Sequence, residues 1–431
     1  MEKPNIIYLH SHDTGRYVQP YGHAVPTPNI QRLAEEGMLF RQAFCANPTC
    51  SPSRASLLTG KWAHSCGMFG LVNRGFSLPD YRQHIVHTLR EGGYCSTLAG
   101  IQHVAKDPNQ IGYDQILSGE RNPQAIAGRA QDFLCNAPTE PFFLDVGFGV
   151  THRKFPEPGP AEDPRYTLPP APFPDTPETR YDMAAYKASA RILDDSVGVI
   201  LQALDATHLA ENTLVICTTD HGLAFPGMKC NLTDHGIGVM LIMRGPGGFS
   251  DGKVCDAMVS QIDIFPTLCE LSGIDVPEDV QGKSIMPLIR GEADEIRDEV
   301  FAEVNFHTLY EPQRAVRTRR WKYIRRFSER GRPYLPNCDD SPTKTLWLEH
   351  GWRERPVPME ALYDLVFDPY ETNNVAGDPD VADVLGDLRG RLESWQHETS
   401  DPILEGPIQP PPGAQLNNPD DTSPSDPTYT I

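Results

Sequence analysis

The sequence predicts an α/β protein with a doubly wound, mostly parallel sheet, followed by a smaller C-terminal α+β subdomain. Short apolar segments alternate with helical patterns along most of the chain, which is typical of βαβ units. Polar side chains directly follow several of these segments, where a parallel sheet collects its ligands. The chain has 431 residues, enough for one large α/β domain with an appendage.

The strand candidates are short, apolar and spaced widely enough for helices between them. A helix is predicted before the fourth candidate, because apolar residues recur at helical spacing from Ile192 to Leu204. The strand candidates are Ile6–Leu9, Tyr94–Ala99, Phe142–Phe148, Leu214–Thr218 and Val239–Met243.

A second region begins near residue 296, where Phe301–Val304, Ala315–Thr318 and Trp321–Ile324 predict antiparallel strands around charged turns. We therefore divide the chain into an α/β domain (1–295), an α+β subdomain with an antiparallel sheet (296–400) and a tail (401–431). The tail is rich in Pro, Asp and Asn. We expect it to be disordered or to lie on a neighbouring subunit as an oligomerisation arm, which makes a homo-oligomer the expectation.

Composition limits the partners and the compartment. The net charge of −20 argues against nucleic acid, which normally meets a basic surface. No apolar run approaches the roughly 18 residues that span a bilayer, so no membrane partner is expected. Residues 5–9 already resemble a buried strand, which leaves no room for an export signal, and the ten Cys residues show no paired framework. These features predict a cytoplasmic protein with reduced thiols.

Cys50 lies in the most informative segment of the chain. A lone Cys is usually a buried, inert thiol. Here, however, Cys50 opens the long run Cys-Ser-Pro-Ser-Arg-Ala-Ser-Leu-Leu-Thr-Gly, which ends at Gly60. This run resembles the maturation signature of the type I, formylglycine-dependent sulfatases, a family of the alkaline phosphatase superfamily.

The resemblance implies that Cys50 is a precursor. In that family a formylglycine-generating enzyme oxidises the Cys to formylglycine, whose hydrated aldehyde attacks sulfur. The diol supplies one oxygen to form a covalent ester and another to expel it. Arg54 follows one helical turn later, where its fixed charge would lower the cost of an alkoxide.

The resemblance also implies a divalent metal site. Asp220 and His221 open a stretch that resembles the second metal-ligand segment of the family, and an alignment from the first strand puts His12 and Asp13 at the first. An all-oxygen site would suit calcium. Two imidazoles shift the preference toward manganese, with zinc and iron as further options. The expected ligands are His12, Asp13, Cys50, Asp220 and His221. His10, on the same strand face as His12, is either a partner of the site or a satisfied core His.

Three further residues resemble catalytic positions of the family. His103 matches the His that takes a proton when the ester collapses, although Ile101 replaces a Lys that binds the oxyanion. His152 resembles the His that faces the leaving group. Lys229 matches the basic residue that contacts both the oxyanion and the leaving oxygen.

The resemblance implies a small anionic, sulfated substrate. The run from Cys50 through Gly70 is most similar to the heparan N-sulfatase branch, which implies hydrolysis of a sulfate ester or sulfamate of a small sugar. His12 and Ile101 leave open a phosphonate monoester or phosphodiester hydrolase of the same fold that uses manganese. A binding protein whose catalytic site has decayed is a further alternative.

Overall fold

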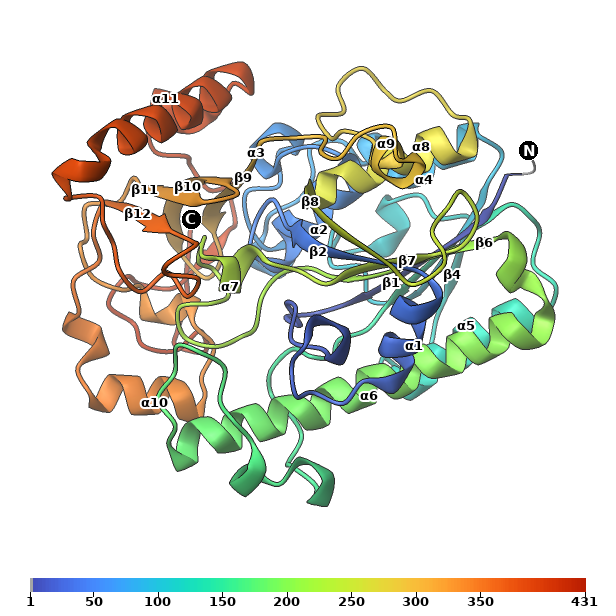
Figure 1. Cartoon of the computed structure of the whole chain (residues 1–431), viewed down its shortest axis with the longest axis horizontal. Coiled ribbons are helices and arrows are strands. Elements are labelled where there is room, and N and C mark those ends of the chain that lie inside the picture. Colours follow the sequence, from blue (N-terminus) through green and yellow to red (C-terminus); the bar gives the residue numbers. More distant parts are fainter. Residues whose placement is uncertain (1–2) are drawn as a thin grey trace.

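The computed structural model describes residues 3–431 and contains two main β-sheets (Figure 1). The larger sheet has eight strands in the order β4-β3-β5-β1-β6-β7-β2-β8. Only β7, among the strands of this sheet, runs antiparallel to its neighbours, β6 and β2. The predicted mostly parallel sheet is therefore confirmed. Its strands are β1 (Asn5–Ser11), β2 (Met38–Phe44), β3 (Cys95–Gly100), β4 (Gln115–Leu117), β5 (Phe142–Gly147), β6 (Thr213–Thr219), β7 (Leu241–Arg244) and β8 (Lys253–Ser260).

Helices cover both faces of this sheet, as a doubly wound fold requires (Figure 1). Helices α1, α5 and α6 pack on one face, and α2, α4 and α8 pack on the other. The apolar repeat between Ile192 and Leu204 lies in α6, the longest helix among the described residues. The helices of this part are α1 (Pro28–Glu36), α2 (Cys50–Thr59), α3 (Ala63–Cys66), α4 (Ile85–Glu91), α5 (Pro123–Cys135), α6 (Pro177–Thr207), α7 (Asp234–Ile237), α8 (Ile264–Ser272) and α9 (Met286–Arg290).

Strand β1 lies at the centre of the sheet and is buried along its whole length. Its side chains alternate between the faces: Ile7 packs among residues of α1, α5 and α6, whereas Ile6 and Tyr8 face the side of α2. His10 continues the second set, and its ring stacks on Tyr8 with the centroids 4.6 Å apart. The period of the strand thus directs His10 toward α2.

The smaller sheet is antiparallel, with the order β12-β11-β10-β9. The predicted strands at 301–304, 315–318 and 321–324 lie in β9 (Glu299–Phe306), β10 (Tyr310–Thr318) and β11 (Trp321–Arg326), and β12 spans Glu360–Asp364. Helix α11 (Ala382–Glu398) covers this sheet, while α10 (Pro342–Glu349) packs against α6. The change of sheet falls between α9 and β9. One hydrophobic cluster nevertheless includes residues of both sheets, so the two parts share a core.

The C-terminal tail is folded onto its own chain. Residues 401–431 contain a small hairpin of β13 (Gln415–Leu416) and β14 (Tyr429–Thr430). Ala414 and Leu416 are buried in the main hydrophobic cluster, and Asp401 forms an ion pair with Arg314. These contacts place the tail on its own chain and not in a disordered state, because it carries apolar anchors that its polar composition does not reveal. Its role as an oligomerisation arm stays a prediction. The expected homo-oligomer stays a prediction.

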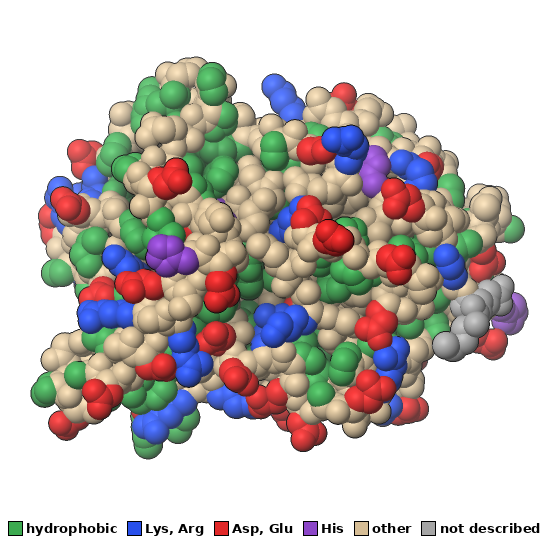
Figure 2. All heavy atoms as spheres, turned by 90° about the horizontal axis from the view of Figure 1, so that it is seen from above, with side chains coloured by type: hydrophobic (Ala, Val, Ile, Leu, Met, Phe, Trp, Pro, Cys, Tyr) green, Lys and Arg blue, Asp and Glu red, His purple; other side chains and the backbone are tan. Residues whose placement is uncertain are grey.

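The surface carries acidic and basic side chains interspersed on the face seen in Figure 2. Within residues 3–431, no helix has both the length and the apolar character needed to cross a membrane.

Candidate active site

The predicted site residues meet at the carboxyl ends of neighbouring strands. β1 and β6 pair in parallel with Ser11 opposite Thr219, so the residues that follow each strand emerge side by side. β5 pairs with β1 on its other edge and leads into the loop that carries His152. The topology therefore brings together segments separated by about 200 residues in the sequence, as expected for a ligand site of such a sheet.

The five predicted metal ligands lie together. One ligand atom each from His12, Asp13, Cys50 and Asp220 lies within 4.8 Å of the others. His221 joins this cluster, with Nε2 3.3 Å from Asp13 Oδ1 and 3.5 Å from Cys50 Sγ. Its Nδ1 lies 3.0 Å from the carbonyl oxygen of Gly222 and donates to it, which leaves the Nε2 lone pair facing the cluster.

This donor set fits a divalent cation. Asp13 Oδ1 is buried without a hydrogen-bond partner among the described residues. His12 Nδ1 lies 3.1 Å from Asp220 Oδ2 but lacks the geometry of a hydrogen bond. Buried polar atoms without partners are costly, and a cation would satisfy both. Two imidazoles and two carboxylates form a mixed nitrogen and oxygen site, which first-row transition metals bind well.

Arg54 anchors one side of the cluster from within the core. Its Nη2 donates to Asp220 Oδ2 at 3.0 Å and to the Ser11 carbonyl oxygen at 2.7 Å, and its Nη1 contacts His10 Nδ1. His10 Nε2 in turn lies 2.8 Å from Asp145 Oδ1. Of the two expectations for His10, the structure supports both in one arrangement: the ring is satisfied in the core, and it orients Arg54. Burial and the neighbouring Arg54 lower the pKa of His10, which keeps the ring neutral.

Cys50 begins helix α2 and is 2% exposed. Burial raises the pKa of its thiol far above the usual value, against the opposing charge of Lys229 and with the help of Asp220 and Asp13. A protonated thiol is a poor nucleophile. The environment therefore suits a precursor side chain better than a working thiolate.

Lys229 lies on the opposite side of the cluster and connects three side chains. Its Nζ lies 3.0 Å from Asp13 Oδ2, 3.0 Å from Asp339 Oδ2 and 3.4 Å from His152 Nε2. Burial favours the neutral amine, but Asp13 and Asp339 outweigh it and hold the pKa of Lys229 well above its usual value. The His152 side chain is 40% exposed, against 2% for Lys229, so the site opens to solvent beside His152.

His103 lies on the remaining side, in the loop after β3. Its ring centroid is 5.6 Å from that of His12, and it forms a close group with His12 and Cys50. Its Nδ1 has no hydrogen-bond partner among the described residues. Burial, with a smaller effect from Arg54, lowers the pKa of His103 to about 3. All the site residues expected from the sequence are thus brought together.

The C-terminal region contributes two further side chains that were not expected from the sequence. Asp339 precedes α10, and His307 lies in the turn between β9 and β10. His307 is buried, and its pKa lies well below the usual value because of burial and the charge of Lys229. No sequence pattern marks either residue as part of a site. Asp339 belongs to an Asp-Asp-Ser-Pro segment that is typical of a helix start.

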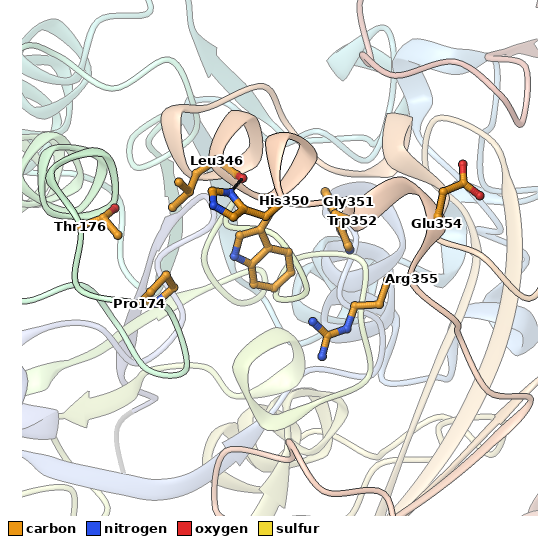
Figure 3. Close-up of a pocket in the computed structure, with 9 residues that line it drawn as sticks. Pro174, Thr176, Leu346, His350, Gly351, Trp352, Glu354 and Arg355 are labelled. Carbon is orange, nitrogen blue, oxygen red and sulfur yellow. Dashed lines mark hydrogen bonds between the residues drawn. The ribbon is translucent and has the colours of Figure 1, made fainter.

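A surface pocket of about 600 Å³ lies elsewhere, and none of the predicted site residues lines it (Figure 3). Helix α10 and the segment after it form one wall. Its lining residues are Pro174, Thr176, Leu346, Trp347, His350, Gly351, Trp352, Glu354 and Arg355.

A doubly wound sheet with candidate metal ligands at its carboxyl edge is typical of α/β enzymes that use a divalent cation. The chain belongs to the sulfatase family, because the family model described as Sulfatase matches residues 4–274, more than half of the chain. A second model, described as N-sulphoglucosamine sulphohydrolase, C-terminal, matches residues 228–345. The chain is accordingly a sulfatase, a sulfuric ester hydrolase.

Similar proteins agree with this assignment. Human N-sulphoglucosamine sulphohydrolase is 31% identical, over 94% of this chain and 92% of its own length. An ulvan-active sulfatase of Formosa agariphila is also 31% identical, over 94% of this chain and 82% of its own. A solved 2-O GAG sulfatase shares the fold with a TM-score of 0.73 at 22% identity, covering 95% of each chain.

Proposed function

We propose that this sulfatase hydrolyses the sulfate ester or sulfamate of a small sulfated saccharide, through a formylglycine made from Cys50 and a divalent cation. The arrangement of Cys50 supports the proposal most strongly: its buried, protonated sulfur lies within 4.8 Å of ligand atoms from His12, Asp13 and Asp220. The names of the relatives support the substrate class, since they include a sulphoglucosamine sulphohydrolase and a hexuronate-2-O-sulfatase. A formylglycine-generating enzyme is then a required partner.

A bound cation and the formylglycine would supply charge stabilisation and an oxygen nucleophile at position 50. The chain itself positions that oxygen, because α2 begins at residue 50 and Arg54 ties the helix to Asp220. Asp220 has a fixed orientation: its Oδ1 accepts from the backbone N–H groups of Asp13 and His221. A rigid carboxylate of this kind can hold a proton-bearing oxygen in one place.

Lys229, His152 and His103 complete the proposed roles. The Lys229 ammonium group is placed to bind the negative oxygens of the substrate and to give up a proton near the leaving atom. His152 Nδ1 lies 2.5 Å from the Arg153 carbonyl oxygen and donates to it, so its Nε2 faces Lys229 as an acceptor. His103 offers an unpartnered Nδ1 across the cluster, where it can accept a proton from the side chain at position 50.

A phosphonate monoester or phosphodiester hydrolase with manganese is the second candidate. The imidazole of His12 in the ligand cluster favours it, because nitrogen donors suit manganese better than calcium. The position of Ile101, where the family carries a Lys for the sulfate oxygens, favours it as well.

We also propose a cytoplasmic location. All ten Cys residues are free thiols, and most of them are buried singly in the core. Such thiols suit a reducing compartment.

The test measures hydrolysis by protein whose formylglycine content has been verified by mass. Nitrophenyl sulfate, phenylphosphonate and bis-nitrophenyl phosphate are compared in calcium and then in manganese. The proposal expects dominant sulfate turnover that Cys50→Ala abolishes, while Cys66→Ala, which removes another buried thiol, keeps it. Dominant phosphonate or diester turnover would favour the second candidate, and metal binding without any turnover would indicate a binding protein.

A further inference from the structure

Asp339 places a carboxylate beside the group that should bind the substrate anion. Its Oδ2 accepts from Lys229 Nζ at 3.0 Å, and its side chain is 14% exposed. No protein donor among residues 3–431 occupies its Oδ1. The carboxylate therefore has a free acceptor oxygen at the entrance of the site, next to His152 and Lys229.

Taken alone, the carboxylate of Asp339 weakens the binding of an anionic sulfate group. Lys229 already has Asp13 as a counterion, and a second carboxylate cancels positive charge that a sulfate group needs. The position of Asp339 is not the result of a disordered loop, because hydrogen bonds hold the preceding turn. Asn337 Oδ1 accepts from the backbone and side chain of Thr308, and Ser341 caps α10. Asp339 is held in place, so its free oxygen is available to a group of the substrate that could compensate for the repulsion.

A second metal ion does not compensate for the repulsion between Asp339 and the substrate anion. Asp13, His152 and Asp339 do form a group of possible ligands. However, the ammonium group of Lys229 lies among them, within 3.0 to 3.4 Å of all three side chains. A cation would have to displace this buried charge and leave it unpaired, which is costly.

We infer that Asp339 selects substrates whose leaving atom is a nitrogen that bears hydrogen, so that the sulfamate R–NH–SO₃⁻ is preferred over the matching ester. This inference rests on the proposed function. In an ester the bridging oxygen has no hydrogen to donate, and Asp339 only repels the anion. In a sulfamate the bridging N–H can donate to the free Oδ1 of Asp339.

The amine product of sulfamate hydrolysis also favours a carboxylate beside the leaving nitrogen. The overall reaction is R–NH–SO₃⁻ + H₂O → R–NH₃⁺ + SO₄²⁻. The S–N bond breaks with its electron pair on nitrogen, a new S–O bond forms to the water-derived oxygen, and both water protons end on the nitrogen. The leaving group thus changes from neutral N–H to ammonium, and a neighbouring carboxylate stabilises it increasingly along the reaction.

The test compares two substrates that differ only in the bridging atom: N-sulfoglucosamine and glucose 2-sulfate. Wild-type protein should show the higher kcat/KM on N-sulfoglucosamine. Asp339→Asn should lower that kcat/KM by about 10- to 100-fold, as expected for the loss of a charged hydrogen bond, and leave glucose 2-sulfate within about 3-fold. Asp340→Asn is the matched control, because Asp340 contacts Lys344 and Ser423 instead, and it should change neither value.

Product binding provides a second readout. Glucosamine, which carries an ammonium group, should inhibit wild-type protein more strongly than glucose does, and Asp339→Asn should remove the difference. Equal losses on both substrates would overturn the inference and make Asp339 a partner that only positions Lys229. Turnover of nitrophenyl sulfate without any preference for N-sulfoglucosamine would also overturn it, while the proposed function would stand.

Discussion

Arg54 and Asp220 form an ion pair in the interior of the protein, with Nη2 3.0 Å from Oδ2 and side-chain exposures of 1% and 0%. Both partners have other hydrogen bonds that fix their orientation: Arg54 to Ser11 and His10, and Asp220 to two backbone N–H groups. The pair joins helix α2, which carries Cys50, to the end of β6, which carries the metal-type ligands. The same contact therefore serves both the core and the site.

Arg54→Ala should destabilise the protein strongly, because it leaves Asp220 as a buried charge without its partner. We expect the free energy of unfolding to fall by about 3–5 kcal/mol. Denaturant titration measures this fall. Arg82→Ala is the control, since Arg82 pairs with Asp80 on the surface and should matter by less than about 1 kcal/mol. A loss for Arg54→Ala as small as that of the control would contradict the role assigned to the buried pair.

His12→Asp should change the metal preference of the site. Replacing an imidazole with a carboxylate gives a more oxygen-rich set, which calcium prefers. We expect affinity for calcium to rise relative to manganese by about tenfold or more, measured by calorimetric titration of the metal-free protein. His208→Asp makes the same change of charge at the opposite end of β6, on an exposed residue, and should leave the ratio unchanged. An unchanged ratio in His12→Asp would remove His12 from the ligand set.

The sequence predicted the central strands because each contains an uninterrupted apolar segment. β1 and β6 are buried along their whole length, and their apolar segments clearly predict strands. β2 was missed, since the exposed Arg41 and the half-buried Gln42 interrupt its apolar pattern. β8 was missed as well, because its first two residues, Lys253 and Val254, are exposed. β8 is the edge strand and β2 lies next to it, and polar residues in both strands interrupt the apolar pattern from which a strand is predicted.

The site residues likewise fall into a group that the sequence predicts and a group that it does not. His12, Asp13, Asp220 and His221 follow central strands, so the rule for parallel sheets places them together. Asp339 comes into the site only through the packing of the C-terminal region, with its loop fixed by Asn337 and Ser341. Such a contact depends on tertiary structure alone, and a single sequence contains no pattern that predicts it.

The tail contributes to stability in a pH-dependent way through Asp401. Burial alone would raise its pKa, but the two hydrogen bonds from Arg314, at 2.6 and 2.8 Å, hold the pKa below its usual value. A lowered folded-state pKa gives stability that is complete above about pH 4, the unfolded value, and is lost as pH falls through the folded value. Asp401→Asn should therefore cost about 3 kcal/mol at pH 7.

Denaturant titrations between pH 7 and pH 2 check this prediction. The curves of the wild-type protein and of Asp401→Asn should approach each other as the wild-type carboxyl group becomes protonated. Asp420→Asn is a suitable control, because its ion pair with Arg330 involves a side chain of Asp420 that is 83% exposed. A difference that stays constant over the whole pH range would show that the charge of Asp401 does not carry the effect.

Leu416 tests whether the tail is part of the folded core. Its side chain lies in the main hydrophobic cluster and is 3% exposed, whereas Leu404, in the same tail, is 44% exposed. Removing a buried Leu side chain leaves a cavity and usually costs about 2–5 kcal/mol. We expect Leu416→Ala to lower the free energy of unfolding by an amount in this range and Leu404→Ala by less than about 1 kcal/mol. If both variants unfolded like the wild-type protein, the tail would not contribute to the core. That outcome would favour the alternative in which the tail is an arm exchanged between subunits.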